Sequence, residues 1–163
     1  MLIRTYQSSD AADFLALNQS NLDGLGPLDH ERLAWLVGMS EQCLVADVDG
    51  TFAGFVLTIA PGTAYDSINY RWYAEHGHHA MLYLDRVAVD PAYRRRGIAS
   101  ALYDRAEAQA RDFGGIALEV YIEPPNESSL AFHAARGYTE VGRLTQSDGK
   151  TCVMLVKSLT DSD

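Results

Sequence analysis

Apolar and polar residues alternate along several short segments of this chain, and this pattern predicts β-strands with one buried face. Asp49 and Gly50 separate two of the segments, and this pair is typical of a two-residue hairpin turn. Pro91 ends another segment, because proline has no amide hydrogen to donate to a neighbouring strand. The predicted strands are 2–6, 42–48, 51–60, 81–89, 116–122, 138–145 and 151–157.

Other segments carry apolar residues three and four positions apart, which predicts amphipathic helices. The longest of them runs from Gly97 to Phe113 and is stopped by Gly114 and Gly115, a pair that suits a left-handed helix end. Residues that favour a helix start stand at the head of each helix. The expected starts are Ser8 or Ser9, Asp29, a position near Asp66, Gly97, and Asn126 after two prolines.

These elements follow one another as strand, two helices, two strands, a short helix, and then strand, helix, strand, helix and two strands. The order predicts a mixed α/β fold, with one sheet flanked by helices. The sequence has 163 residues, which is the usual size of one domain, and no linker-like stretch divides it. We therefore expect a single domain over residues 1–160, with 161–163 as a frayed tail.

The charge and composition of the chain argue against several classes of function. The chain holds 22 acidic and 13 basic residues, for a net charge of −9, and this disfavours nucleic-acid binding. It has no apolar run of membrane-spanning length and no signal-peptide pattern at its N-terminus, so we expect a cytoplasmic protein without a membrane partner. Cys43 and Cys152 are too few for a disulfide framework and are expected to be buried thiols. The histidines at 76, 78 and 79 have no second ligand cluster, so no metal is expected.

The most informative stretch is residues 84–100, which read LDRVAVDPAYRRRGIAS. It predicts a strand, a turn with three arginines and one glycine, and the start of a helix. The first amides of a helix have no partner within it and carry partial positive charge, so they bind phosphate groups well. Gly97 has no side chain to keep a ligand from the backbone. The sequence therefore predicts an anion site at this turn.

Two motifs give this stretch a resemblance to a known family, the GNAT superfamily of N-acetyltransferases. The family's acyl-CoA signature, Q/R-x-x-G-x-G/A, is similar to Arg94-x-x-Gly97-x-Ala99. Its second pattern, NxxAxxFYxxxGF, is similar to Asn126-x-x-Ser129-x-x-Phe132-His133-x-x-x-Gly137-Tyr138. The two motifs occur in the family's order, and the resemblance is strong over residues 81–141.

The resemblance implies a central, mixed but mostly antiparallel sheet of about seven strands, with acetyl-CoA between two splayed strands. The backbone of the strand ending at Val89 would bind the pantetheine arm as an added strand would. The amides and arginines of the turn would hold the diphosphate. The cofactor-binding residues implied are Val87, Ala88, Val89, Arg94, Arg95, Arg96, Gly97, Ile98, Ala99, Ser100, Asn126, Ser129 and Phe132.

The same resemblance suggests where the chemistry takes place. An attacking amine must be neutral, so a base is useful, and Glu119 and Asp85 both stand at positions where family members carry one. In the family a tyrosine usually donates the proton that the leaving thiolate needs, but this chain has His133 at that motif position. His133 is therefore a candidate acid, with Tyr138 as the alternative donor. Each of these residues is also compatible with a structural role.

Two function classes follow from the resemblance. The first is an enzyme that moves an acetyl group directly from acetyl-CoA to a primary amine of a small molecule or a peptide. The second is a non-catalytic acyl-CoA binding module, which the departure at His133 leaves open. The acceptor side would include Tyr65, Tyr70 and Trp72, unless these aromatic residues only fill the core. A homodimer is left open as well, because many relatives dimerise.

Overall fold

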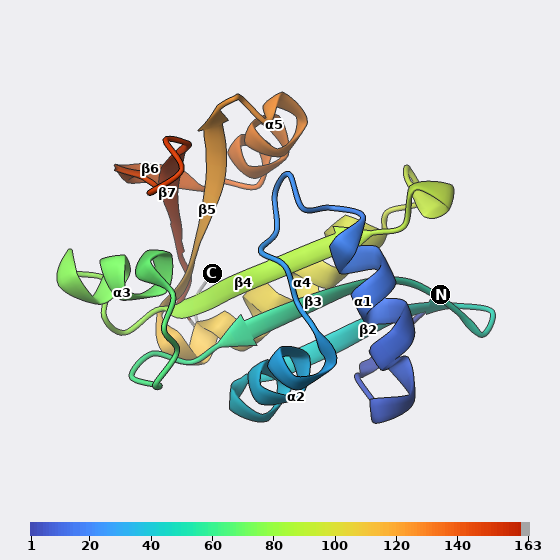
Figure 1. The fold of residues 1–163 in the computed structure, drawn as a ribbon. Helices are drawn as coiled ribbons and strands as arrows, with labels where there is room; N and C mark the ends of the chain where they lie inside the picture. The colour runs from blue at the N-terminus through green and yellow to red at the C-terminus, as the bar shows by residue number, and fades with distance from the viewer. Residues whose placement is uncertain (161–163) are drawn as a thin grey trace.

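The computed structural model describes residues 1–160, and their seven strands form one sheet (Figure 1). The sheet order is β1-β2-β3-β4-β5-β7-β6, and every neighbouring pair is antiparallel except β4 and β5. The expected mixed, mostly antiparallel sheet is confirmed. The strands are β1 (Leu2–Thr5), β2 (Gln42–Val48), β3 (Thr51–Ile59), β4 (Leu82–Val89), β5 (Gly115–Glu123), β6 (Thr139–Thr145) and β7 (Thr151–Ser158).

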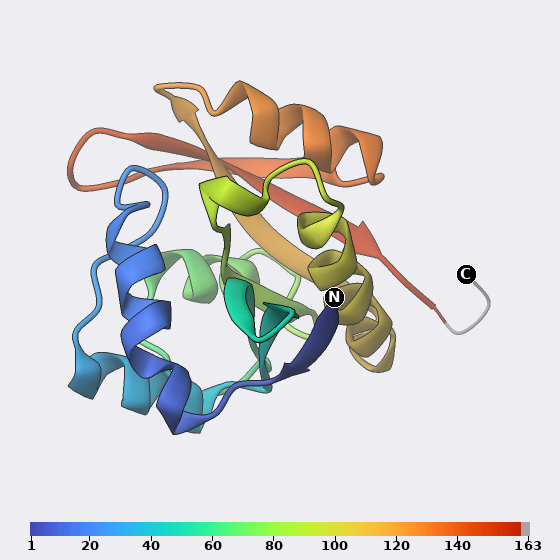
Figure 2. The same ribbon diagram turned by 90° about the vertical axis from the view of Figure 1, so that its right-hand side faces the viewer.

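Helices cover both faces of the sheet, with α1, α2 and α3 on one face and α4 and α5 on the other (Figures 1 and 2). Each face has its own apolar core, as expected for a sheet packed between two helical layers. Among residues 1–160 no helix is long and apolar enough to cross a membrane. The helices are α1 (Ala11–Gln19), α2 (His30–Met39), α3 (Ile68–Glu75), α4 (Ile98–Ala110) and α5 (Glu127–Ala135), with 3-10 turns η1 (Ser8–Asp10), η2 (Pro91–Tyr93) and η3 (Arg111–Phe113).

Most helix boundaries follow from the capping residues that the sequence indicated. The Asp29 side chain accepts a hydrogen bond from the Arg32 amide at 2.7 Å and so caps α2. Gly114 ends η3 with a φ of +75°, which is a left-handed C-cap. The prediction of a cap at Ser8 or Ser9 is wrong. These residues form η1, because the Asp10 carboxylate accepts from the Gln7 amide and holds the chain in a tight turn before α1.

The feature that creates the site is the separation of β4 from β5. These parallel strands pair only at Leu82 with Ile116 and at Tyr83 with Ala117, and β5 then runs away from β4 (Figure 1). The register of β4 on β3 also shifts at this point, which leaves Asp85 as an extra residue. The expected splay of the two strands is therefore confirmed.

The splay exposes one main-chain edge of β4. The Asp90 amide donates to the Ala53 carbonyl at 2.8 Å, so this residue faces β3. Hydrogen-bonded and non-hydrogen-bonded pairs alternate along an antiparallel ladder, so Ala88 also faces β3. The main-chain groups of Val87 and Val89 consequently point to the opposite side, where β5 has departed. An extended ligand placed there finds unpaired donors and acceptors.

Candidate functional site

A cleft of about 750 Å³ opens where β4 and β5 diverge. Its walls come from six places in the chain: the loop between α1 and α2, the segment that leads into α3, the middle of β4, Arg94 of the arginine turn, the middle of β5, and α5 with the facing side of α4. The wall therefore combines one arginine of the anion turn with the candidate catalytic residues. This size suits a small-molecule site.

The start of α4 forms one end of the site. Gly97 is the N-cap with a φ of +76°, and its carbonyl accepts the first bond of the helix, from the Ala101 amide. No side chain among the described residues caps this end, so the amides of residues 98–100 have no protein partner. A Cβ built on Gly97 would meet no atom within 4 Å, so the space beside the Gly97 backbone is open. The turn is thus a cradle ready for an anion.

The three arginines that directly precede this cradle in the chain add positive charge near it. Arg94, Arg95 and Arg96 are exposed, and Arg94 lines the cleft. Arg95 has a φ of +63°, a left-handed conformation that lets the chain turn sharply just before Gly97. The Arg96 guanidinium lies over the Tyr93 ring, 5.1 Å from its centroid. This local excess of positive charge stands in a chain that is acidic overall.

The second sequence motif forms the wall that faces the β4 edge. The Asn126 side chain caps α5 by accepting from the Ser129 amide at 3.3 Å, and both residues line the cleft. Phe132 is half-buried and packs edge-on against Tyr103, with ring centroids 5.0 Å apart. Phe132 therefore supports this wall from behind, whereas Asn126 and Ser129 are at its surface.

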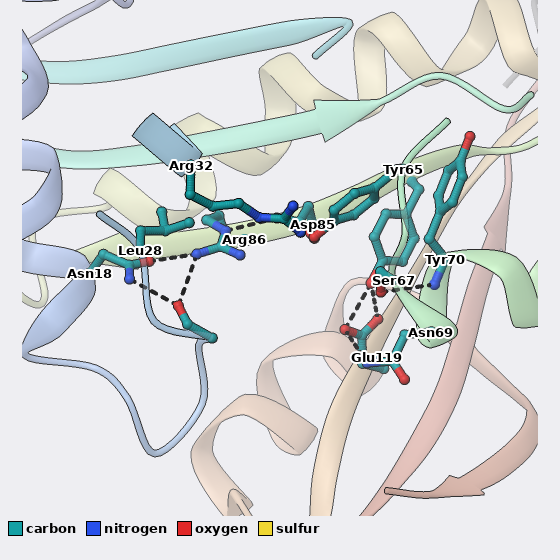
Figure 3. A network of polar contacts seen from close by, with 12 residues as sticks. Asn18, Leu28, Arg32, Tyr65, Ser67, Asn69, Tyr70, Asp85, Arg86 and Glu119 are labelled. Atoms are coloured by element: carbon teal, nitrogen blue, oxygen red, sulfur yellow. Dashed lines mark hydrogen bonds and ion pairs between the residues drawn. The ribbon is translucent and has the colours of Figure 1, made fainter. Parts of the chain in front are cut away.

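Glu119 stands on β5 and lines the cleft; Figure 3 shows its position next to Asn69. Its carboxylate accepts hydrogen bonds from the Tyr83 hydroxyl at 2.7 and 2.8 Å and from the Asn69 amide at 3.0 Å. Burial, with the nearby negative charge of Asp85, raises the pKa of Glu119 from 4.5 to about 7, although the bonds from Tyr83 and Asn69 act in the opposite direction. A carboxylate with this pKa can accept a proton near neutral pH.

Asp85 has a different environment on β4. One carboxylate oxygen accepts from the Tyr65 hydroxyl at 2.6 Å, and the other pairs with the Arg86 guanidinium at 2.7 Å. Arg86 in turn donates to the Asn18 side chain (Figure 3) and to the Gly26 carbonyl. Asp85 is therefore part of an ion-paired network that fastens the loop between α1 and α2 to β4. Both of its oxygens are already occupied.

His133 is buried between α4 and α5, with its ring held at both nitrogens. Nδ1 is 2.7 Å from the Ser129 carbonyl oxygen, which can only accept, so this nitrogen carries the proton. Nε2 then accepts from the Tyr103 hydroxyl, also at 2.7 Å. Burial lowers the pKa of His133, which favours this neutral form. The proton of His133 is directed to the helix backbone and away from the cleft.

The three aromatic residues expected on the acceptor side occupy different places. Tyr65 lines the cleft above Asp85. Tyr70 does not line it; its hydroxyl donates to the Ala60 carbonyl at 2.6 Å. Trp72 is also absent from the lining and is stacked on His76, with centroids 4.0 Å apart. Of the three, the structure brings only Tyr65 to the cleft.

Four residues of the site were missed from the sequence: Asn69, Tyr83, Arg86 and Tyr103. Tyr83 and Asn69 hold Glu119, and Tyr103 holds His133. The signal for Tyr83 was weak, because a tyrosine in a strand is usually a packing residue. Tyr103 follows the apolar Leu102 on a predicted helix and gave no signal of chemistry. These contacts join residues 30 to 50 positions apart in the chain, which no local pattern reveals.

The cysteines and histidines form no further reactive centre in the part of the chain that the structure describes. Cys43 and Cys152 are free and buried, as expected, and burial raises the pKa of each thiol to about 12. Such thiols are poor nucleophiles near neutral pH. Among residues 1–160 no three His, Cys, Asp or Glu side chains are grouped so as to hold a metal ion.

Comparisons with known proteins agree with this geometry. Residues 12–138 match the model of the Acetyltransferase (GNAT) family. The L-2,4-diaminobutyric acid acetyltransferase of Nocardia farcinica is 29% identical over 147 residues, which span 89% of this chain and 68% of that protein. Two solved structures share the fold. Ard1 of Thermoplasma volcanium has a TM-score of 0.78 at 19% identity, with 98% of both chains covered. The yncA protein of Salmonella typhimurium, solved with its cofactor acetyl-CoA, has a TM-score of 0.74 at 20% identity, covering 99% of this chain and 95% of that one.

Proposed function

Since this chain belongs to the acetyltransferase (GNAT) family, and is thus an acyltransferase, we propose that it moves an acetyl group directly from acetyl-CoA to a primary amine. The observation that carries the proposal is a pair of features at one cleft. Arg94, from the turn before the uncapped start of α4, and Glu119, a carboxylate whose pKa is about 7, both line it. The first feature suits a diphosphate, and the second suits an amine that must lose a proton.

The residues at the cleft fit acetyl-CoA, which supplies the acetyl thioester. The amides from Arg95 to Ser100 and the three arginines hold the diphosphate. The free main-chain edge at Val87 and Val89 takes the extended pantetheine arm as an added strand, and Asn126 and Ser129 border it. A main-chain N–H near Val87 stabilises the charge that develops on the acetyl carbonyl oxygen.

Glu119 serves as the base in this proposal. An alkyl amine with a pKa of about 10.4 is almost wholly protonated near neutral pH, so the attacking nitrogen must first lose a proton. Glu119 accepts that proton, directly or through water, while Tyr83 and Asn69 fix its position. Asp85 instead holds Arg86 and shapes the acceptor side. Because both cysteines are buried with raised pKa values, we assign no acetyl-cysteine step.

Replacing Tyr83 by phenylalanine tests the assignment of Glu119. The Tyr83 hydroxyl favours the charged carboxylate, so its loss raises the pKa of Glu119 above about 7. A base works only when deprotonated, and therefore the fall of kcat/KM on acidification should begin at a higher pH in Y83F. The control is Y70F, which loses a hydroxyl that bonds only within the neighbouring loop. An unchanged midpoint in Y83F would exclude Glu119 as the titrating base.

The overall proposal is tested by following thiol release from acetyl-CoA with a panel of amines. The panel holds L-2,4-diaminobutyric acid, because a relative is named for that substrate, together with polyamines and peptides with free N-termini. We expect release above the rate without amine for at least one class. Tight binding of acetyl-CoA without release across the whole panel would instead support the second function class, a non-catalytic acyl-CoA binding module.

A further inference from the structure

The leaving sulfur is the one reacting atom for which the cleft has no assigned partner. When the C–S bond breaks, the electron pair goes to sulfur, and the thiolate is stabilised by any hydrogen-bond donor in reach. The sequence offered His133 for this role. In the structure, however, its Nδ1 proton is held by the Ser129 carbonyl, and its Nε2 is an acceptor. His133 therefore has no proton to offer toward the cleft.

Tyr103 on α4 supplies the hydroxyl that α5 lacks. Its oxygen lies 2.7 Å from His133 Nε2, and both residues contribute to the lining of the cleft. A tyrosine at position 133 would extend its own hydroxyl past the place where the shorter histidine ring ends. The Tyr103 hydroxyl stands just beyond that ring. A donor missing from one helix is thus provided by the helix packed against it.

The location of Tyr103 agrees with this role. Leu84 and Leu118 are the first residues after the last β4–β5 pair, and they share an apolar core with Tyr103 on the face covered by α4. Glu119 and Tyr83 bond to each other on the opposite face, where α3 provides Asn69. A thioester lying in the opening between the strands would therefore have Glu119 on one face and Tyr103 on the other.

We propose that the Tyr103 hydroxyl donates a hydrogen bond to the departing sulfur and that His133 is the residue that positions it. This rests on the proposed function above. Tyr103 keeps its proton, because burial raises the pKa of its phenol above 10 while a thiol has a pKa of about 8.5. The ammonium loses two protons, one to Glu119 before the attack and one from the nitrogen after it; one of them reaches the thiolate through water and the other passes to solvent, so the exchange balances. His133 Nε2 holds the Tyr103 hydroxyl until the C–S bond breaks, and the single phenolic proton then turns, by rotation about the C–O bond, to the negatively charged sulfur, which is the stronger acceptor.

The first test uses free CoA as the probe and needs no acceptor. In the wild-type protein the hydroxyl should stabilise the bound thiolate and lower the pKa of the CoA thiol, read from the ultraviolet absorbance of the thiolate as pH is raised. A hydrogen bond to a charged group shifts the equilibrium toward the charged form by about tenfold or more. In Y103F the bound thiol should therefore have a pKa higher by about one unit. Equal values in the two proteins would overturn the proposal.

Turnover gives the second test. In Y103F we expect kcat to fall about tenfold to a hundredfold, with the KM values for acetyl-CoA and amine unchanged. The matched control is Y73F, which also removes a buried hydroxyl, here one that bonds the Leu118 and Leu155 carbonyls and does not line the cleft. A merely structural role predicts similar losses in both variants. A drop in Y73F as large as that in Y103F, or no drop in Y103F, would contradict the proposal.

His133 variants keep the test available if Y103F does not fold. In H133Q the amide oxygen can still accept from Tyr103, so the thiol pKa of bound CoA should stay near the wild-type value. In H133L the hydroxyl loses its anchor, and the thiol pKa should rise. Equal values in H133Q and H133L would refute the positioning role. Failure of the wild-type protein to bind CoA at all would instead count against the proposed function, so the two failures are distinguishable.

Discussion

Replacing Glu119 by glutamine is expected to lower kcat at pH 7 by about 10²–10⁴-fold, the range for loss of a positioned general base. Glutamine keeps the shape of the side chain and can still accept from Tyr83, but it cannot take a proton from the attacking amine. The pH dependence is the more specific test. The kcat/KM of the wild-type protein should rise with pH, with a midpoint near the pKa of Glu119, about 7, and this rise should be absent in E119Q.

The defect in E119Q should shrink as pH approaches the pKa of the amine, because the free amine then needs no base. The matched control is E123Q, the same substitution four residues along β5 at an exposed position. Its pH profile should equal that of the wild-type protein. Loss of activity in E119Q that is the same at every pH would argue against a role in deprotonation.

The thermal stability of E119Q distinguishes a catalytic defect from a folding defect. The folded-state pKa of Glu119, about 7, lies above the usual value of 4.5, so the folded protein binds this proton more tightly than the unfolded chain. Stability therefore declines as pH rises from about 4.5 to about 7, where the buried carboxylate becomes charged. E119Q lacks this decline and should unfold at a higher temperature than the wild-type protein at pH 8, as thermal denaturation would reveal.

The second large effect is expected from Gly97→Glu, which should abolish measurable acetyl-CoA binding. The new side chain would be added at the N-cap of α4 and would bring a negative charge next to the diphosphate. Two unit charges about 4 Å apart repel by about 4 kcal/mol at an effective dielectric constant of 20, or close to a thousandfold in affinity. Isothermal titration calorimetry with acetyl-CoA measures this directly.

Gly97→Glu also places a side chain where φ is +76°, so backbone strain needs its own control. Gly50→Glu provides it, because Gly50 has a φ of +85°, likewise meets nothing within 4 Å, and lies in the hairpin between β2 and β3. G50E should bind acetyl-CoA as the wild-type protein does, with a comparable loss of stability. Unchanged affinity in G97E would show that the cofactor binds elsewhere.

How much could be predicted from the sequence depends on the range of the interaction. The hairpin at Asp49 and Gly50, the cap at Asp29 and the left-handed end at Gly114 all depend on neighbours within a few residues. Local pattern is sufficient for such features. The start of α1 was misplaced because the Asp10 carboxylate is shared with Arg4 of β1 and with the Gln7 amide, and the first of these is a tertiary contact.

The candidate site divides in the same way. The cradle at Gly97 was predictable, since a glycine before a helix and the arginines beside it are consecutive in the chain. The sequence also named both Glu119 and Asp85 but could not choose between them. We choose Glu119 in our proposal, because its partners Tyr83 and Asn69 are neutral and burial raises its pKa, whereas Asp85 is paired with the Arg86 guanidinium.

The order of strands and helices, the arginine–glycine turn before α4 and the family could all be read from the sequence, because each of them depends on short runs of neighbouring residues. The tertiary structure alone decided that Tyr65 lines the cleft while Trp72 does not, and that the proton of His133 is directed away from the cleft. These outcomes depend on side chains from distant segments that meet only when the helices pack on the two faces of the sheet. Hydrogen-bond partners and burial arise from this tertiary packing, so they cannot be predicted from the spacing of residues along the chain.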